Sequence, residues 1–463
     1  MRKIWRGIAA FLSVAAIGIS LASCAESAYD IAVRNGFVGT EKEWLQSLQG
    51  ADGEDAKDVT AKDLYDTAVE NGFTGTYLDF CKDVLQVEVQ SDNDVDIIAQ
   101  NMTSVVSIYC GFTRTVSSGG WWQTAQTEYY ASVGSGVVID IDKANGNALI
   151  VTNYHVIYDS ASSAKNGVSD KIFLYGYGSL NGFSSQEGDT LGTGIQATFV
   201  GGAMDYDIAV LEVRGSDLIK NSILTAAEIG NSNEIMVGEK VFAIGNPNGE
   251  GISVTQGIVS VKSEYITLSA FDNRDENGDR VVDSVSFRVM RTDAAINGGN
   301  SGGGLFDAYG KLVGIVNAKT VQEGTDNMGY SLPISQVKNV VQNILTNDGT
   351  LKVATLGVMV SITESEGYYD EMGKLDIRES FAITTAATSG ASSYGKLSVG
   401  DQFKAMQIGD GEWYVFERRY ELNDMLLSVK KGDVVRIKII TSNGNEKTVE
   451  IAFDQDAYFK EYK

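Results

Sequence analysis

The sequence predicts a mainly β protein, built as a sandwich or a barrel with few helices. Short apolar runs that suit strands follow one another from about residue 95, among them residues 105–109, 136–139, 148–151, 208–213 and 240–244. Turns containing Asn and Gly separate many of them, as at Asn145-Gly146, and dense short strands of this kind are typical of sandwiches and barrels. The chain has 51 glycines and only two prolines, which suits tight turns and leaves no proline-rich linker.

The first 23 residues have the pattern of a secretory leader. Arg2, Lys3 and Arg6 precede an apolar run over residues 8–21, and this run is too short for a comfortable membrane span. It ends in Leu-Ala-Ser-Cys24, which resembles a bacterial lipobox, where the cysteine is lipidated and becomes the new N-terminus. We expect a lipid anchor at Cys24 and a position outside the cytoplasm; an ordinary cleavage site beside an incidental cysteine is the alternative.

Residues 24–90 contain two short repeats. The sequence of residues 29–40 returns in similar form at residues 65–76. Each copy predicts a short helix, an Asn-Gly stop and a second short helix. We expect a spacer or surface-interaction module near the anchor. The repeats resemble short segments of secreted proteins from Gram-positive bacteria, which favours that origin.

The composition argues against several classes of ligand. The formal charge is −24, with 61 acidic and 37 basic side chains, so nucleic acid is not expected, because phosphate binding needs clustered Lys and Arg. The chain has one histidine, which excludes zinc sites built on two or three imidazoles. We expect neither a metal nor a cofactor. Cys81 and Cys110 lie in different segments, so we expect small buried residues, and whether they pair stays open.

Residues 273–279 partly resemble a calcium loop. Asn273 and Ser284, however, stand where an EF-hand needs Asp and Glu. We therefore expect an exposed acidic insertion between strands.

The first convincing helix after residue 95 covers residues 334–345, whose apolar positions have helical spacing. Asn347-Asp348-Gly349 ends it. A separate small α+β domain follows, over residues 352–456, with an expected strand at 356–360 and an expected helix at 420–429. A hairpin over residues 434–440 and 447–453 completes it, with its turn at Ser442-Asn443-Gly444.

Three residues have the properties of a nucleophilic hydrolase. The single histidine, His155, lies in Thr-Asn-Tyr-His-Val, and imidazole is the commonest general base at neutral pH. Ser301 lies in Gly-Asn-Ser-Gly-Gly, where glycines allow the tight turn and exposed N–H groups that a nucleophile needs; a flexible glycine loop is the alternative. Asp207 stands at the mouth of an apolar strand and would orient the imidazole. A simple turn is its alternative, and Asp205, further from the strand, is less suited.

The order His155, Asp207, Ser301 is that of the chymotrypsin-like fold. Eight segments together resemble the HtrA (high-temperature-requirement) branch of the trypsin-fold serine proteases: residues 134–138, 152–156, 207–211, 243–247, 257–260, 292–297, 299–303 and 328–333. The resemblance covers roughly residues 95–345. It implies a chymotrypsin-like double β-barrel protease domain over residues 95–348.

The resemblance also implies roles. Ser301 would attack the peptide carbonyl, His155 would transfer the proton, and Asp207 would orient His155. Backbone N–H groups of Gly299 and Ser301 would form the oxyanion hole. Val316, Asn317 and Ala318, with residues 296–300, would form the wall of the substrate pocket. Neither stretch contains an acidic residue, which favours small or medium apolar substrate side chains over Lys and Arg.

The last domain resembles a PDZ module. Such modules bind peptide C-termini by strand addition, and Leu356, Gly357 and Val358 would belong to the loop that receives the carboxylate. The match to this module is weaker over the acidic stretch 364–378 and the irregular stretch 409–417. The alternative is therefore a groove that serves only for packing.

The family implies an endopeptidase acting on unfolded or misprocessed polypeptides, and a homotrimer. Two other interpretations stay open. One is a catalytically idle or chaperone-like surface protein that binds peptides through its last domain. The other is a protease held inactive until a peptide binds there.

Overall fold

The computed structural model describes residues 61–70, 94–117, 125–179, 183–184, 189–190, 194–274, 280–317, 328–369, 373 and 375–462. The chain divides into two compact units, Met1–Gln90 and Ser91–Lys463. In the first unit the structure describes helix α4 (Ala61–Glu70), which begins before the second predicted repeat and overlaps it at residues 65–70. Cys24, Cys81 and the rest of the predicted repeats lie outside the described residues. None of the helices in the described ranges has the length and apolar character of a membrane span.

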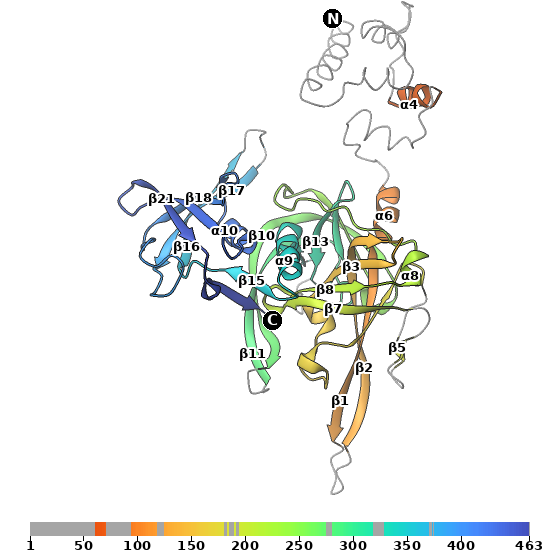
Figure 1. Ribbon diagram of the computed structural model, residues 1–463. Coiled ribbons are helices and arrows are strands. Elements are labelled where there is room, and N and C mark those ends of the chain that lie inside the picture. The colour runs from red at the N-terminus through yellow and green to blue at the C-terminus, as the bar shows by residue number, and fades with distance from the viewer. Residues whose placement is uncertain are drawn as a thin grey trace, which may run out of the picture. The chain divides into compact units, whose positions relative to one another are not determined.

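Helix α6 (Asp94–Met102) leads into a first closed barrel. Its strands, in barrel order, are β1 (Val105–Ser117), β2 (Ala125–Asp142), β3 (Asn147–Thr152), β8 (Ile208–Val213), β7 (Ile195–Ala203) and β4 (Lys171–Tyr175). Apolar side chains of these strands, such as Ile108, Val137 and Ile150, are fully buried. Cys110 is also buried there, with a free thiol whose pKa is raised by that burial. Figure 1 shows β1 and β2 continuing beyond the barrel as a long hairpin.

A second closed barrel follows in the chain. Its strands, in barrel order, are β10 (Ser253–Arg274), β11 (Arg280–Thr292), β14 (Gly329–Pro333), β13 (Leu312–Val316), β12 (Gly304–Asp307) and β9 (Lys240–Gly245). Val241, Val259 and Leu305 are part of its buried core. The two closed barrels confirm the predicted chymotrypsin-like fold.

Short elements connect the barrel strands. They are α7 (Tyr154–Ile157), η3 (Lys165–Gly167), β5 (Phe183–Ser184), β6 (Asp189–Thr190), η4 (Met204–Tyr206), α8 (Asp217–Lys220) and η5 (Pro247–Gly249). Residues 275–279 of the proposed acidic insertion lie outside the described residues. Asn273 and Arg274, just before them, pair with Val281 and Arg280 as ends of β10 and β11. The insertion therefore joins two strands, whereas an EF-hand loop joins two helices.

Helix α9 (Ile334–Thr346) closes the barrel domain and occupies the predicted range. Its end is set by Asp348 and Gly349, which have φ values of 51° and 84°. A left-handed conformation of this kind stops a helix and is most easily adopted by Gly and Asp. The helix buries Val337, Val340 and Ile344.

The C-terminal domain contains two sheets and one helix. Strand β15 (Leu351–Ala354) pairs with β22 (Phe459–Tyr462). The larger sheet has the order β16 (Met359–Tyr369), β17 (Leu375–Thr385), β18 (Gln402–Ile408), β20 (Val434–Ile440) and β21 (Glu446–Ala452), with β19 (Tyr414–Val415) beside β18. Helix α10 (Arg419–Ser428) and the short η7 (Asp456–Tyr458) complete the domain. The helix and the final hairpin lie within one residue of their predicted bounds.

One expectation for this domain was wrong. The strand predicted at residues 356–360 begins only at Met359, because Gly357 has a φ of 73° and turns the chain. The acidic stretch 364–378 is largely a regular antiparallel hairpin, in which residues 359–369 pair with residues 375–385. Strand β16 is exposed over most of its length.

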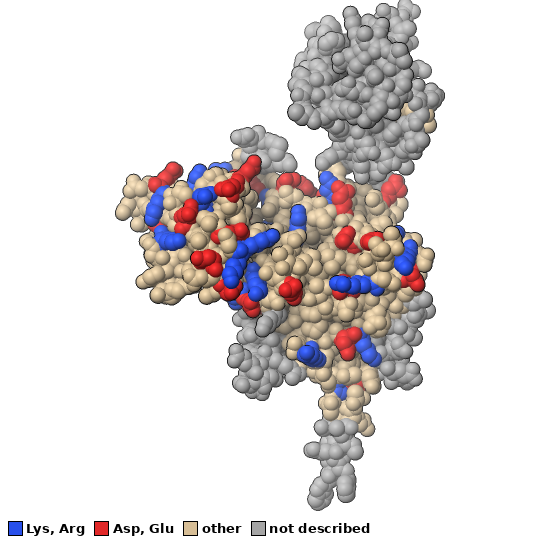
Figure 2. Space-filling model, viewed as in Figure 1, with Lys and Arg blue, Asp and Glu red and all other residues tan. Residues whose placement is uncertain are grey.

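Basic and acidic side chains are interspersed over the face seen in Figure 2. No extended basic patch is visible on the described part of this face. Among the residues with described positions, no group of three or more His, Cys, Asp or Glu is placed to hold a metal ion.

Candidate active site

His155 projects from the short helix α7, which begins immediately after β3. Its neighbours Tyr154 and Val156 are buried and fix the helix in the first barrel. The His155 side chain keeps 16% of its surface exposed. The imidazole is thus held by the barrel but remains accessible from one side.

Asp207 lies at the start of β8, beside the same end of β3. It has φ 50° and ψ 42°, a left-handed conformation that caps η4. Asp and Asn tolerate this region better than most residues do. The side-chain amide of Asn153 donates to the Asp207 carbonyl oxygen at 3.0 Å and supports this backbone shape.

The Asp207 carboxylate is fully buried and faces His155. Its Oδ1 accepts the His155 backbone N–H at 3.0 Å, and its Oδ2 lies 2.7 Å from His155 Nδ1. Asp205 is exposed. Of the two aspartates, the structure brings Asp207 to the imidazole.

Ser301 lies on a tight loop between β11 and β12. Its Oγ is 2.9 Å from His155 Nε2. The loop turns through Gly299 and Gly302, which have φ values of 94° and 84°. A Cβ on Gly302 would lie 2.1 Å from the Ser135 carbonyl oxygen, so this position requires glycine.

Ser135, on β2 of the first barrel, ties this loop to that barrel. Its N–H donates to the Ser301 carbonyl at 2.8 Å, and its hydroxyl donates to the Gly299 carbonyl at 2.7 Å. Thr152 donates its hydroxyl to the Ser135 carbonyl at 2.6 Å. Ser135 stood in one of the eight matching segments, but nothing in the sequence indicated this contact.

The predicted oxyanion-hole residues lie on the same turn as the nucleophile. A Cβ on Gly299 would lie 2.2 Å from the Asn246 carbonyl oxygen, so a larger residue would displace the turn. The turn is closed by hydrogen bonds from Asn300 N–H to the Asn297 carbonyl at 3.1 Å and from Gly303 N–H to the Asn300 carbonyl at 2.9 Å.

The predicted pocket residues have other neighbours than expected. Val316 is fully buried in the core of the second barrel. The Asn317 side chain is also fully buried, and its amide donates to Asp207 Oδ2 at 2.9 Å. Ala318 lies outside the described residues. No local sequence pattern could have shown whether the Asn317 side chain contacts Asp207 or lines a pocket.

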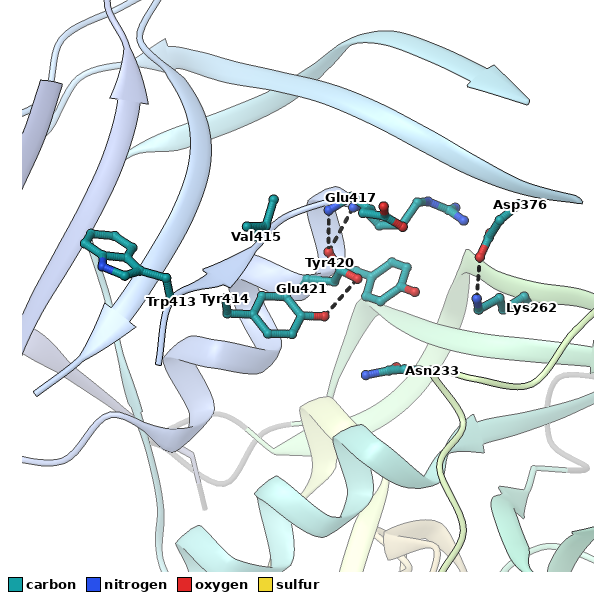
Figure 3. A pocket seen from close by; sticks show the side chains of 10 residues that line it. Asn233, Lys262, Asp376, Trp413, Tyr414, Val415, Glu417, Tyr420 and Glu421 are labelled. Carbon is teal, nitrogen blue, oxygen red and sulfur yellow. Dashed lines mark hydrogen bonds and ion pairs between the residues drawn. The ribbon is translucent and has the colours of Figure 1, made fainter. Parts of the chain in front are cut away.

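A cleft of about 460 Å³ lies elsewhere, where the C-terminal domain meets the second barrel. Asn233 and Lys262 line it from the barrel side, and Tyr414 and Tyr420 line it from the other (Figure 3). Its charged groups are already engaged, since Lys262 pairs with Asp376 at 2.6 Å and the Tyr414 hydroxyl donates to Glu421 at 3.0 Å. No serine, cysteine or histidine is among the described residues that line the cleft, so the constellation around Ser301 is the candidate active site.

The site lies between two closed barrels and consists of a serine, an imidazole and a buried carboxylate in a continuous line. This arrangement defines the class of trypsin-like serine proteases. Residues 134–315 match the family model for the trypsin-like peptidase domain. The Serine protease Do-like HtrA of Bacillus subtilis (strain 168) is 31% identical over 334 residues, covering 70% of this chain and 64% of that protein. The protein of the same name from Lactobacillus helveticus is 30% identical over 329 residues, covering 69% of this chain and 67% of that protein.

The chain therefore belongs to the HtrA family of Do-like serine proteases. It spans from about half to two thirds of the length of the curated relatives it matches. The solved structure "HtrA-type protease AlgW with decapeptide" is 23% identical, with a TM-score of 0.47, and the match covers 77% of this chain and 96% of that chain.

Proposed function

We propose that this protein is a serine endopeptidase that hydrolyses peptide bonds in unfolded or misprocessed polypeptides. One observation carries the proposal: Ser301 Oγ, His155 and the Asp207 carboxylate form one line of contacts at 2.9 Å and 2.7 Å. The 2.9 Å distance allows proton transfer between Ser301 and the imidazole, and the 2.7 Å distance allows Asp207 to orient the imidazole. Membership of the HtrA family supports the same activity.

In the proposed reaction, Ser301 Oγ attacks the carbonyl carbon while its proton passes to His155 Nε2. Asp207 holds the imidazole with Nδ1–H directed at its carboxylate and stabilises the imidazolium that forms. The Gly299 and Ser301 N–H groups stabilise the oxyanion, each contributing on the order of 10²–10³ in rate. His155 then returns the proton to the leaving amine, and water repeats the sequence on the acyl-enzyme.

The chain offers a matched pair of aspartates for testing this function. We expect the mature chain to cleave casein, and Ser301→Ala to abolish cleavage. Asp207→Asn should lower kcat by about 10⁴-fold, because the imidazole would be held in the wrong tautomer. Asp205→Asn, which changes an exposed aspartate two residues away, should stay within about twofold of wild type, as surface changes usually do.

A fluorophosphonate probe separates the protease from the idle surface protein. It should label the wild-type chain and leave Ser301→Ala unlabelled. A wild-type chain that resists labelling, with or without added peptide, would favour the idle or chaperone-like alternative.

We also propose that the protein is held outside the cytoplasm by a lipid on Cys24. The leader pattern over residues 1–23 and the lipobox-like ending support this location. On detergent phase separation, the wild-type protein should partition into the detergent phase and Cys24→Ala into the aqueous phase. Equal partitioning would contradict the anchor.

For the C-terminal domain we propose capture of peptide C-termini at the loop of Leu356, Gly357 and Val358. The left-handed Gly357 supports this, as does anchoring of the Leu356 carbonyl by the Ser393 hydroxyl at 2.6 Å. In addition, β16 is an edge strand of the described sheet, and an edge strand can accept a further strand. A fluorescent peptide with a free carboxylate should bind, and its amidated form should not.

The same peptide tests the inhibited-protease alternative. Casein cleavage that rises when the free-carboxylate peptide is added, and not with the amidated one, would support regulation through this domain. Sedimentation of the mature chain would test the expected homotrimer.

A further inference from the structure

Asn317 makes a contact that links the acid of the site to the second barrel. It follows β13 directly, and its side chain is fully buried. The amide nitrogen donates to Asp207 Oδ2 at 2.9 Å. This oxygen is also the one that lies 2.7 Å from His155 Nδ1. The amide therefore acts on the carboxylate oxygen that orients the imidazole.

A buried carboxylate needs hydrogen-bond donors to stay ionised, because burial penalises its charged form. His155 supplies a backbone N–H to Oδ1 and its ring nitrogen to Oδ2. A donor from a third direction prevents the carboxylate from turning about its own bonds. Asn317 supplies this donor without adding a charge.

The position of Asn317 also connects the acid to the nucleophile. His155 and Asp207 belong to the first barrel, whereas Asn317 and Ser301 belong to the second. Next to Asn317, the Val316 carbonyl accepts the Gly302 N–H at 2.9 Å, and the Val316 N–H donates to the Gly303 carbonyl at 2.8 Å. The end of β13 is therefore hydrogen-bonded to the residues that follow Ser301.

The backbone of Asn317 is itself anchored. Its N–H donates to the Tyr330 carbonyl at 2.9 Å, on neighbouring strand β14. Because its backbone is anchored in this way, the Asn317 side-chain amide can hold the Asp207 carboxylate at a defined distance.

We propose that Asn317 is a positioning residue, which sets the Asp207 carboxylate against His155 and aligns it with the Ser301 loop. This inference rests on the proposed protease function. It assigns Asn317 a role different from lining the substrate pocket. The residue touches no reacting atom and acts through Asp207.

The test is Asn317→Leu in the mature chain, which keeps nearly the same side-chain size and removes the donor. A lost hydrogen bond to a charged group corresponds to roughly a 10- to 100-fold effect. We expect kcat on a fluorogenic peptide to fall by about that factor, while KM stays within about twofold. A pocket residue would instead change KM and the preference among substrate side chains.

A second readout is specific to the triad and independent of turnover. The chain has a single histidine, so the far-downfield imidazole N–H proton resonance belongs to His155 alone. We expect Asn317→Leu to move this resonance.

Asn101→Leu is the matched control. Asn101 is a buried asparagine of α6 whose amide donates to the Ile97 carbonyl at 3.0 Å, outside the triad. It should lose stability but keep the His155 resonance and the kcat of its folded fraction. An unchanged resonance and kcat in Asn317→Leu would overturn the proposal, as would equal losses of kcat in both variants with no change in the resonance.

If Asn317→Leu does not fold, Asn317→Ala decides. It removes the same donor, so kcat should fall and the His155 resonance should move. No change in either would overturn the proposal. Ser301→Ala separates failure of the proposed protease function from failure of the proposed role of Asn317. If Ser301→Ala cleaves as well as wild type, the protease function itself fails. If it is inactive while Asn317→Leu behaves as wild type, only the role of Asn317 fails.

Discussion

A buried cation, Arg288, lies at the contact between the second barrel and the C-terminal domain, and removing its charge should destabilise the protein. Arg288 of β11 is 2% exposed, and its guanidinium bonds to the Asp424 carboxylate on α10. It also donates to the Ser263 hydroxyl at 3.1 Å and lies 3.5 Å from the centre of the Tyr420 ring. The change to make is Arg288→Met, which keeps the apolar stem and removes the charge.

This change leaves the Asp424 carboxylate buried without its partner. Burial already raises the pKa of Asp424, and Arg288 is the main group opposing that rise. Removing one partner of a buried ion pair costs about 3–5 kcal/mol of stability. We expect this loss at pH 7 in equilibrium unfolding by guanidinium, followed by circular dichroism and tryptophan fluorescence.

The pH dependence follows from the sign of the pKa shift. A carboxyl group whose pKa is raised in the folded state gains stability as the pH falls through that raised value, because the folded protein binds the proton more tightly. Without Arg288 the pKa of Asp424 rises further. The deficit of Arg288→Met should therefore shrink between pH 7 and pH 5.

Arg288→Met/Asp424→Leu is the control, because it replaces the ion pair with apolar groups, a change that is often nearly neutral. The double variant should recover most of the lost free energy at pH 7. A loss below about 1 kcal/mol in the single variant, or a deficit of equal size at pH 5 and pH 7, would refute this reasoning.

Three further predictions concern steric limits and a thiol. Gly302→Ala should reduce casein turnover by more than about 100-fold, because the added Cβ would lie 2.1 Å from the Ser135 carbonyl and displace the nucleophile loop; near-wild-type turnover would contradict this. Gly201→Ala should lower the free energy of unfolding by about 1–3 kcal/mol, since its Cβ would meet the Gly349 carbonyl at 2.1 Å, and an unchanged Tm would count against it. Cys110 should resist maleimide in a variant lacking the other two cysteines and react only on unfolding, because burial raises its pKa; rapid labelling of the native chain would show the thiol to be accessible.

Much of the fold was predictable because its strands and helices follow from patterns of apolar and turn residues close together in the chain. Alternating and continuous apolar runs predicted the barrel strands. The helical spacing over residues 334–345 predicted α9 to within one residue of its ends. Asn347-Asp348-Gly349 ended that helix as expected, because left-handed backbone favours those residue types. The strand expected from residue 356 was wrong. Gly357 adopts a positive φ and turns the chain there, which the apolar run did not indicate.

The identities of the candidate triad were also accessible without coordinates. A chain with a single histidine has one possible imidazole base, and the residues around Asp207 and Ser301 have the local properties that an orienting acid and a nucleophile need. The choice of Asp207 over Asp205 rested on its distance from an apolar strand, and that strand does carry Asp207 to the imidazole.

By itself the sequence determined the class of fold, the family resemblance and the three residues that would perform the chemistry. Only the tertiary structure decided what holds them in register. The bond from Asn317 to Asp207 joins residues 110 positions apart, and that from Ser135 to Gly299 joins residues 164 positions apart. The physical reason is that strand and helix patterns arise from interactions between near neighbours in the chain. A side-chain hydrogen bond across two barrels leaves no local pattern, and it exists only once both barrels have closed.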